Sequence, residues 1–134
     1  MLARRAFASC AFCGVLGLTA SKVAAQPAGG LTRNLLRRED VPGTNYVNIQ
    51  MLVEIEPNAV VARHTHPGHE GSYIIEGRSE LLVQGQAPRM IGPGDSFLVP
   101  AGVPHAARNG PAKTRIFGTF VVEKDKPLAT PAPE

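Results

Sequence analysis

Hydrophobic and polar residues alternate along the middle of the chain. The clearest case spans residues 47–55, where every second residue is apolar: Val47, Ile49, Met51, Val53 and Ile55. A period of two is typical of a β-strand with one buried face. This region therefore predicts a strand that covers a hydrophobic core with one of its sides.

Shorter stretches of the same kind follow along the chain. We expect further strands at residues 35–37, 60–66, 72–76, 80–84, 96–99, 105–108 and 115–123. Pairs with turn chemistry separate them, including Pro57-Asn58, Pro67-Gly68, Pro93-Gly94 and Asn109-Gly110. About eight short strands at regular spacing, with no convincing helix, predict an all-β fold, an antiparallel barrel or sandwich.

The beginning of the chain has the pattern of a cleavable export signal over residues 1–25. Arg4 and Arg5 precede an apolar run from Ala6 to Ala20, and Val23-Ala24-Ala25 supplies small residues for cleavage. The run is too short to span a bilayer comfortably, so we expect a periplasmic or secreted protein with no membrane contact after processing. Arg4-Arg5-Ala6-Phe7 resembles the twin-arginine signal in part, and a mitochondrial transit peptide is the alternative.

The remaining boundaries follow from composition. Residues 26–30 are expected to form a linker, residues 31–125 one folded domain, and residues 126–134, rich in Pro and Ala, a disordered tail. Cys10 and Cys13 have C-x-x-C spacing but lie in the apolar run, so they are expected to leave with the signal. The mature domain then has no thiolate ligands.

Charge excludes one class of function. Apart from Arg4, Arg5 and Lys22, the chain has 11 basic and 11 acidic side chains, and it contains no Trp. A neutral domain with few aromatic residues lacks the electrostatic and stacking surface of a nucleic-acid-binding protein. We therefore set this class of function aside.

All four histidines of the protein lie in two short stretches. His64, His66 and His69 stand beside Glu70, and His105 follows in a later strand. His64 and His66 are two residues apart on an expected strand, so both project from the same face. Imidazoles and a carboxylate without sulfur suit first-row divalent metals. This concentration predicts a metal site with coordination positions left open for a substrate.

The two stretches resemble the two motifs of the cupin superfamily. The first, G-x5-H-x-H-x3,4-E-x6-G, has its counterparts at Asn58, His64, His66, Glu70 and Gly77, with Asn in place of the first Gly. The second, G-x5-P-x-G-x2-H-x3-N, is matched at Gly94, Pro100, Gly102, His105 and Asn109. Asn tolerates the positive φ that this first corner needs.

The resemblance implies a double-stranded β-helix, or jelly-roll barrel, that holds one divalent transition metal. It implies His64, His66, Glu70 and His105 as ligands. Mn, Fe, Co, Ni, Cu and Zn all suit such a site, and we favour Mn or Fe because a twin-arginine route would let the domain take its metal in the cytoplasm. His69 is not a ligand of the family, which leaves it as a rim, positioning or catalytic residue.

The resemblance leaves several functions open. Members with this ligand set include dioxygenases as well as isomerases and lyases, and others are non-catalytic binding proteins. Only Glu70, His69 and Gln50 are visible as candidate acids or bases, which favours oxygen chemistry or simple Lewis-acid work. Of these we expect dioxygenase-like oxygen chemistry by a metal-dependent enzyme that acts on a small-molecule substrate. Small cupins commonly pair, so we also expect a homodimer in which the segment from Leu31 to Arg38 covers an exposed edge.

Overall fold

Ten short strands make up most of the chain that the structure describes, a computed structural model of residues 28–134. The expected export signal, with Cys10 and Cys13, lies outside the described residues. The elements are η1 (Ala28–Gly30), β1 (Leu31–Asp40), β2 (Tyr46–Ile55), β3 (Val60–Thr65), β4 (Gly68–Glu76), β5 (Ser79–Val83), β6 (Arg89–Ile91), β7 (Ser96–Val99), β8 (His105–Asn109), β9 (Thr114–Glu123) and β10 (Thr130–Pro131).

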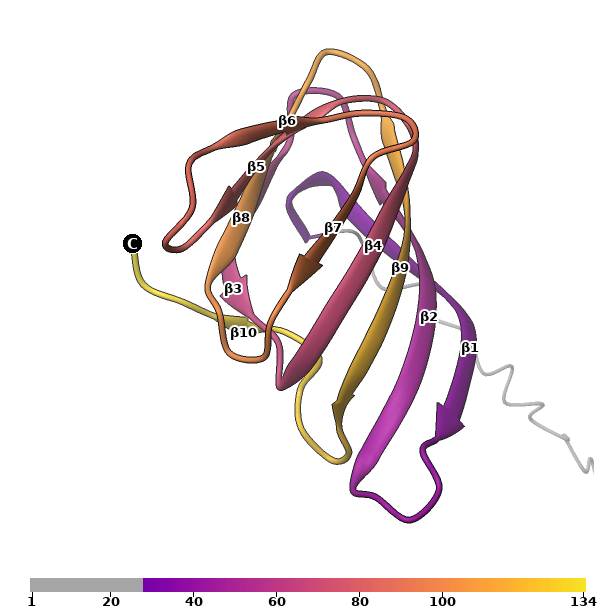
Figure 1. Cartoon of the computed structure of the whole chain (residues 1–134). Coiled ribbons are helices and arrows are strands. Elements are labelled where there is room, and N and C mark those ends of the chain that lie inside the picture. Colours follow the sequence, from indigo (N-terminus) through magenta and orange to yellow (C-terminus); the bar gives the residue numbers. More distant parts are fainter. Residues whose placement is uncertain (1–27) are drawn as a thin grey trace, which may run out of the picture.

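The strands form two five-stranded antiparallel sheets that face each other (Figure 1). One has the order β1-β2-β9-β4-β7 and the other β10-β3-β8-β5-β6. Consecutive strands repeatedly alternate between the two sheets, which is the winding of a jelly roll. The predicted all-β fold is therefore confirmed. No helix within residues 28–134 has the length and apolar character needed to cross a membrane.

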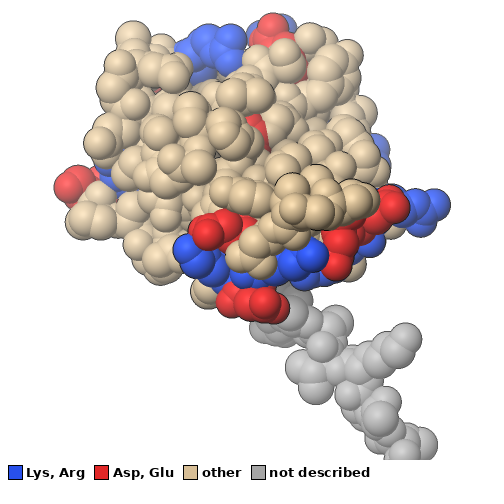
Figure 2. Space-filling model, turned by 60° about the horizontal axis from the view of Figure 1, so that its bottom comes forward, with Lys and Arg blue, Asp and Glu red and all other residues tan. Residues whose placement is uncertain are grey.

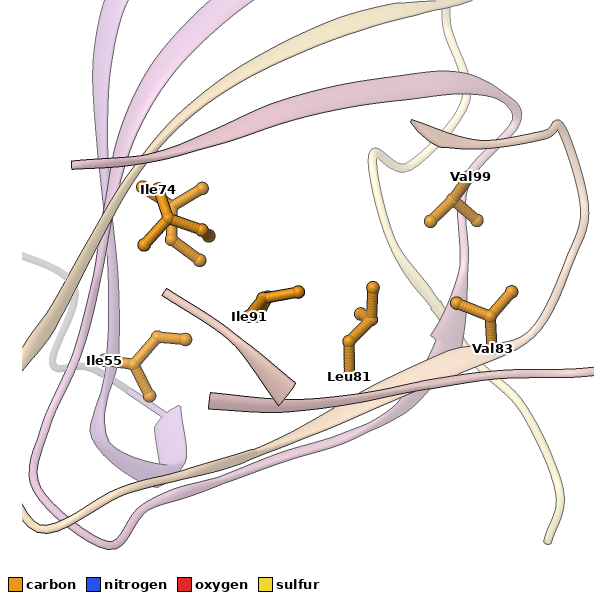
Figure 3. Packing of buried hydrophobic residues seen from close by; sticks show 7 residues of the cluster. Ile55, Ile74, Leu81, Val83, Ile91 and Val99 are labelled. Carbon is orange, nitrogen blue, oxygen red and sulfur yellow. The ribbon is translucent and has the colours of Figure 1, made fainter. Parts of the chain in front are cut away.

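The alternation at residues 47–55 gives the buried face that it predicts. Val47, Ile49 and Ile55 in β2 are at most 5% exposed, and β2 pairs along its whole length with β9. The larger of the core clusters fills the space between the two sheets (Figure 3). It contains Ile55, Ile74, Leu81, Val83, Ile91, Val99 and Ile116. Burial of these branched side chains is the main source of stability in such a barrel.

Two positions of the first motif have the positive φ of a tight corner. Asn58, at the position of the first motif glycine, has φ of 59°, and the amide of Ala59 donates to the carbonyl of Glu56 across this turn. Gly77 has φ of 82°, and a Cβ there would lie 2.5 Å from the Cα of Thr114. A side chain at Gly77 is thus excluded both by backbone strain and by lack of space.

The carboxy-terminal segment corrects one expectation, because residues 126–134 are not a disordered tail. Thr130 and Pro131 pair with Thr65 and His64 as strand β10, and the guanidinium of Arg63 donates to the carbonyl of Pro133 at 2.7 Å. The segment covers the edge of β3, whose backbone groups would otherwise lie unpaired. Pro131 is tolerated in β10 because an edge strand does not need every backbone amide to donate a hydrogen bond.

Strand β6 and the first half of β4 were also not expected from the pattern. β6 has only three residues, too few to show a period, and β4 begins at Gly68 rather than near Ser72. Glycine at position 68 is required by packing, because a Cβ there would lie 2.0 Å from the carbonyl oxygen of Val121. Close contact between β4 and β9 thus takes precedence over the low strand propensity of Gly68.

Charged side chains of both signs lie side by side on the surface. Figure 2 shows Lys and Arg next to Asp and Glu along one margin of the view, while the rest of that face is largely uncharged. One such pair joins Lys124 and Asp40 at 2.9 Å. On the free edge of the first sheet, β1 exposes Leu35 and Leu36, which are 60% and 45% accessible. This edge is the segment on which the homodimer prediction rests.

Candidate metal centre

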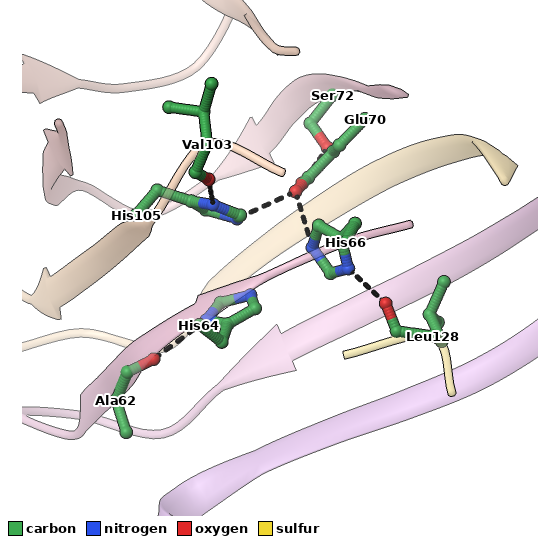
Figure 4. A network of polar contacts seen from close by, with 8 residues as sticks. All are labelled: Ala62, His64, His66, Glu70, Ser72, Val103, His105 and Leu128. Atoms are coloured by element: carbon green, nitrogen blue, oxygen red, sulfur yellow. Dashed lines mark hydrogen bonds and ion pairs between the residues drawn. The ribbon is translucent and has the colours of Figure 1, made fainter. Parts of the chain in front are cut away.

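Three strands from both sheets bring the predicted ligands together. His64 lies in β3 and is directly paired with His105 at the start of β8. His66 follows β3, two residues after His64, and therefore returns to the same face. Glu70 extends from β4 in the opposite sheet, where it is paired with Val99 and Phe120. The four side chains meet inside the barrel (Figure 4).

The ring nitrogens of the three histidines form one compact group. One nitrogen from each of His64, His66 and His105 lies within 4.8 Å of the other two. The carboxylate Oε2 of Glu70 is 3.1 Å from Nε2 of His66 and 3.2 Å from Nε2 of His105. His66 and His105 are 4% exposed, and Glu70 is 8% exposed. His64 is half-buried, so solvent and ligands reach the group mainly from the side of His64.

Backbone carbonyls determine how the three imidazoles are oriented. Nδ1 of His64 donates to the carbonyl of Ala62 at 2.7 Å, and Nδ1 of His105 donates to that of Val103 at 3.0 Å. Nδ1 of His66 donates to the carbonyl of Leu128 in the carboxy-terminal segment. Because a carbonyl oxygen only accepts, each Nδ1 carries the proton, and each Nε2 is left with its lone pair.

This arrangement fits a divalent transition metal. Metal-bound histidines characteristically donate their second ring nitrogen to a carbonyl or carboxylate. Bonds of about 2.0–2.2 Å to a metal place neighbouring ligand atoms about 3.0–3.4 Å apart, which matches both contacts of Glu70 Oε2. Two acceptor atoms at this spacing repel each other unless a positive charge, a proton or a metal ion, lies between them. His64, His66, Glu70 and His105 would hold the ion.

Electrostatics favours the charge states that metal binding needs. Burial, reinforced by the neighbouring histidines, lowers the pKa of His64 from 6.5 to about 4, so its ring is neutral at pH 7. Burial alone would raise the pKa of Glu70, but the contacts of its carboxylate with His105, His66 and Ser72 together hold that pKa well below its usual range. The site therefore offers an ionised carboxylate beside a neutral imidazole.

Ser72 is a supporting residue that the sequence did not single out. Its hydroxyl donates to Oε1 of Glu70 at 2.7 Å and leaves Oε2 directed at the histidines (Figure 4). The parity of β4 places Ser72 on the inner face, but parity carries no information about this bond. The carbonyl of Leu128 was missed for a different reason, since it belongs to the segment expected to be disordered.

Two candidate residues are not brought to the cluster. His69 is exposed on the outer face of β4, because neighbouring residues in a strand point to opposite sides and Glu70 points inward. Gln50 lies between the inward-facing Ile49 and Met51 and so belongs to the outer face of β2. We therefore withdraw His69 as a catalytic candidate and Gln50 as an acid or base at the metal.

A small, mostly apolar cavity of about 60 Å³ adjoins the four ligands. Its walls include Val53, Phe97 and Ile116 from the core, and the ring of Phe120 packs against His66 with centroids 5.1 Å apart. A space of this size admits a few water molecules or the reactive end of a small ligand. Apolar walls around a charged centre keep bulk water out and strengthen its electrostatic interactions.

Fold and ligands together define a metal-binding double-stranded β-helix, and comparison with known proteins identifies the family. The family model of the cupin domain matches residues 51–121, slightly more than half of the chain. The chain therefore belongs to the cupin family, as the two motifs predict.

The chain is similar to two named enzymes and to a germin-like protein. Over 45 residues the chain is 47% identical to the dimethylsulfoniopropionate lyase DddQ of Ruegeria pomeroyi, covering 34% of this chain and 22% of that protein. The crystal structure of that lyase superposes with a TM-score of 0.60 and 26% identity over 63% of this chain and 43% of the other. A germin-like protein of Arabidopsis thaliana, subfamily T member 3, is 34% identical over 83% of this chain and 48% of its own length.

A third relative is another named enzyme. The structure of the polyketide cyclase RemF from Streptomyces resistomycificus has a TM-score of 0.59 and 26% identity, covering 78% of this chain and 74% of its own. The chain spans less than half the length of the curated relatives that it matches.

Proposed function

We propose that this protein is a metal-dependent cupin enzyme that acts on a small organic molecule inside the barrel. The observation that carries the proposal is the convergence of three Nε2 lone pairs and the Oε2 of Glu70 beside a cavity. A purely structural metal site closes its coordination shell with protein ligands, whereas this group adjoins open space on the side of His64. A substrate entering there would contact the ion directly.

The first candidate reaction is non-oxidative, with the metal supplying Lewis-acid stabilisation of negative charge that develops on the substrate. The named relatives above 25% identity include a lyase and a cyclase, which supports this class. In this chain, Ser72 would keep Glu70 oriented and the core side chains would exclude water. The backbone carbonyls would keep each histidine in the tautomer that offers Nε2.

The second candidate is the dioxygenase-like chemistry favoured by the sequence. One observation supports it: among the described residues that line the cavity there is no Lys, Tyr or Asp, and the carboxylate of Glu70 is held ionised by its partners. A weakly basic carboxylate is a poor proton acceptor. Reactions that rely on a metal and oxygen do not require a separate base at this place.

Turnover with and without oxygen separates these candidates. The metal-loaded protein should be incubated with a panel of small organic acids, esters and diols, and both product formation and oxygen uptake should be followed. Equal turnover in air and under argon would support the non-oxidative class, and stoichiometric oxygen uptake would support a dioxygenase. Tight ligand binding without turnover by any compound would contradict an enzyme and favour a non-catalytic binding protein.

We also propose export to the periplasm or secretion, and a homodimer. Export rests on the sequence of residues 1–25, and changing Arg4 and Arg5 to Lys should block a twin-arginine route, as cell fractionation would show. The dimer rests on the exposed Leu35 and Leu36 at the free edge of β1. Light scattering on the mature protein and on Leu35→Arg tests it, since the variant should be monomeric.

A further inference from the structure

Two arginines, Arg33 and Arg38, lie on the inward-facing side of β1, and Arg33 is the one that lines the cavity at the metal ligands. Arg33 is paired with Val53 of β2, and the alternation that turns Leu31 toward the core turns Arg33 to the same side. Leu31 and Val53 both pack against the main core cluster. Arg33 itself is exposed, so it lies where this face of β1 meets solvent.

Arg33 has no polar partner among the described residues. Among the described residues, side-chain hydrogen bonds or ion pairs are made by Arg37, Arg63, Arg89, Arg108 and Arg115. Arg33, like Arg38 and Arg78, makes none within residues 28–134. Burial lowers the pKa of Arg33, an effect that the attraction of Glu70 partly offsets. Because Arg33 is exposed, water solvates the outward part of its guanidinium, and its N–H donors are available to an anion that binds there.

Arg33 stands between two cavities. It lines the small cavity at the metal ligands together with His64, and the same two residues line a neighbouring cavity of about 500 Å³. Among the described residues that line the small cavity, Glu70 and Arg33 alone carry a permanent charge. The described lining of the larger cavity contains Arg33 and Arg63 but no Asp or Glu. The approach to the cluster is therefore positively charged.

The guanidinium of Arg63 is already occupied in this larger cavity. It donates to the carbonyl of Pro133 and to the side chain of Gln84. Arg33 makes no bond of this kind among the described residues, so all of its donors are available to a ligand on the way to the metal. A divalent ion beside neutral imidazoles and one carboxylate keeps a net positive charge, so a second cation nearby is tolerated best when an anion binds between them.

We propose that Arg33 binds the carboxylate of a small organic acid that enters through the larger cavity and reaches the metal centre with its other end. This inference rests on the proposed function and adds the class of substrate. A guanidinium offers two parallel donors that match a carboxylate, which gives orientation as well as affinity. The alternative is that the aliphatic part of Arg33 merely covers apolar surface while its head stays in water.

Binding measurements on the metal-loaded protein separate these two roles. The probes are propionate and its uncharged counterpart propionamide, followed by calorimetry and by the visible spectrum of the protein loaded with Co²⁺. Arg33→Met keeps the apolar stem and removes the donors, and Arg63→Met is the matched control in the same cavity. Metal content is measured in every variant.

We expect propionate to bind about 10- to 100-fold more weakly to Arg33→Met than to the wild type, and propionamide binding to stay the same. Arg33→Lys should recover part of the difference, and Arg63→Met should change little. Equal propionate affinity in the wild type and Arg33→Met, or no propionate binding to a wild type that holds its metal, would overturn the role of Arg33 alone. A wild type that binds no metal would instead overturn the proposed function.

Discussion

Strand β8 begins at His105 and ends at Asn109, and each of these residues belongs to a buried polar cluster. At its end, Nδ2 of Asn109 donates to the carbonyls of Ile55, Glu56 and Ala112. Its Oδ1 accepts from the hydroxyls of Ser79 and Thr114. Every polar atom of the Asn109 side chain has a partner within the protein, as expected for a structural network.

The cluster at the start of β8 differs in which of its polar atoms have hydrogen-bond partners. Its outer nitrogens are bonded to carbonyls, but the inner Nε2 atoms face one another and the carboxylate of Glu70. Convergence of acceptors without donors is unfavourable for folding alone and favourable for holding a cation. The comparison shows that burial and motif membership do not distinguish the roles of His105 and Asn109, whereas the hydrogen-bond inventory does.

The largest expected effect concerns metal-induced stabilisation. An ion that binds only the folded state at 1,000 times its Kd raises the free energy of unfolding by about 4 kcal/mol. Thermal unfolding of wild type with added Mn²⁺ or Fe²⁺ should show this rise, and His105→Ala should lose most of it. Asn109→Ala should keep it, so a loss of the metal effect in Asn109→Ala would erase the distinction between the clusters.

The next effect is on folding itself. Asn109→Ala leaves buried carbonyls and hydroxyls without partners, and we expect the free energy of unfolding to fall by about 3 kcal/mol. Urea unfolding of the metal-free protein measures it. His105→Ala in the same assay should change stability less, since it removes an unfavourable cluster. A larger loss for His105→Ala would show that the histidines serve folding.

A smaller effect should follow from shortening the carboxy-terminal segment. Ending the chain at Pro127 removes the Leu128 carbonyl that orients His66, and loss of such a supporting bond costs about 10- to 100-fold in metal affinity. Ending it at Ala132 keeps this carbonyl and is the control. Competition with a metal-binding dye compares the two, and equal affinities would mean that the segment only covers the edge of β3.

The smallest effect is the response of the metal-free protein to acid. Between pH 6.5 and about 4 the unfolded chain binds a proton at His64 that the folded chain does not, since the folded pKa is lowered. Stability should therefore fall as the pH falls through this range. Glu70, with its lowered pKa, adds a loss of the same sign below about pH 4.5.

We expect the Tm of the metal-free wild type to drop by several degrees between pH 7 and pH 5. The drop should be smaller in His64→Gln, which has no proton to bind. A Tm that rises on acidification in this range would contradict a neutral, buried His64.

Much of this structure was predictable because the decisive signals are local. Alternation in residues 47–55 specifies the inner face of β2, and the spacing of His64 and His66 places both rings on one side. The second motif marks Asn109, whose side chain closes its loop through bonds to backbone carbonyls. The tail was not predictable in this way, because the pairing of Thr130 with Thr65 depends on an open edge far away in the sequence.

Arg33 shows a second limit of the sequence. The strand containing it was expected only over residues 35–37, so its parity relative to the core was not available. Had the strand been extended to Leu31, the alternation of Leu31 and Arg33 would have placed both on the face turned toward the metal ligands. His69 and Gln50 were expected near the metal for a different reason. Strand parity, which places both side chains on the outer face, was not applied to them.

The central claim is that His64, His66, Glu70 and His105 hold one divalent ion. It is tested most directly by elemental analysis of protein purified without added metal, with His66→Ala and His69→Ala compared to the wild type. We predict about one transition-metal ion per chain in the wild type and in His69→Ala, and almost none in His66→Ala. Unchanged metal content in His66→Ala, or a loss in His69→Ala, would contradict the assignment.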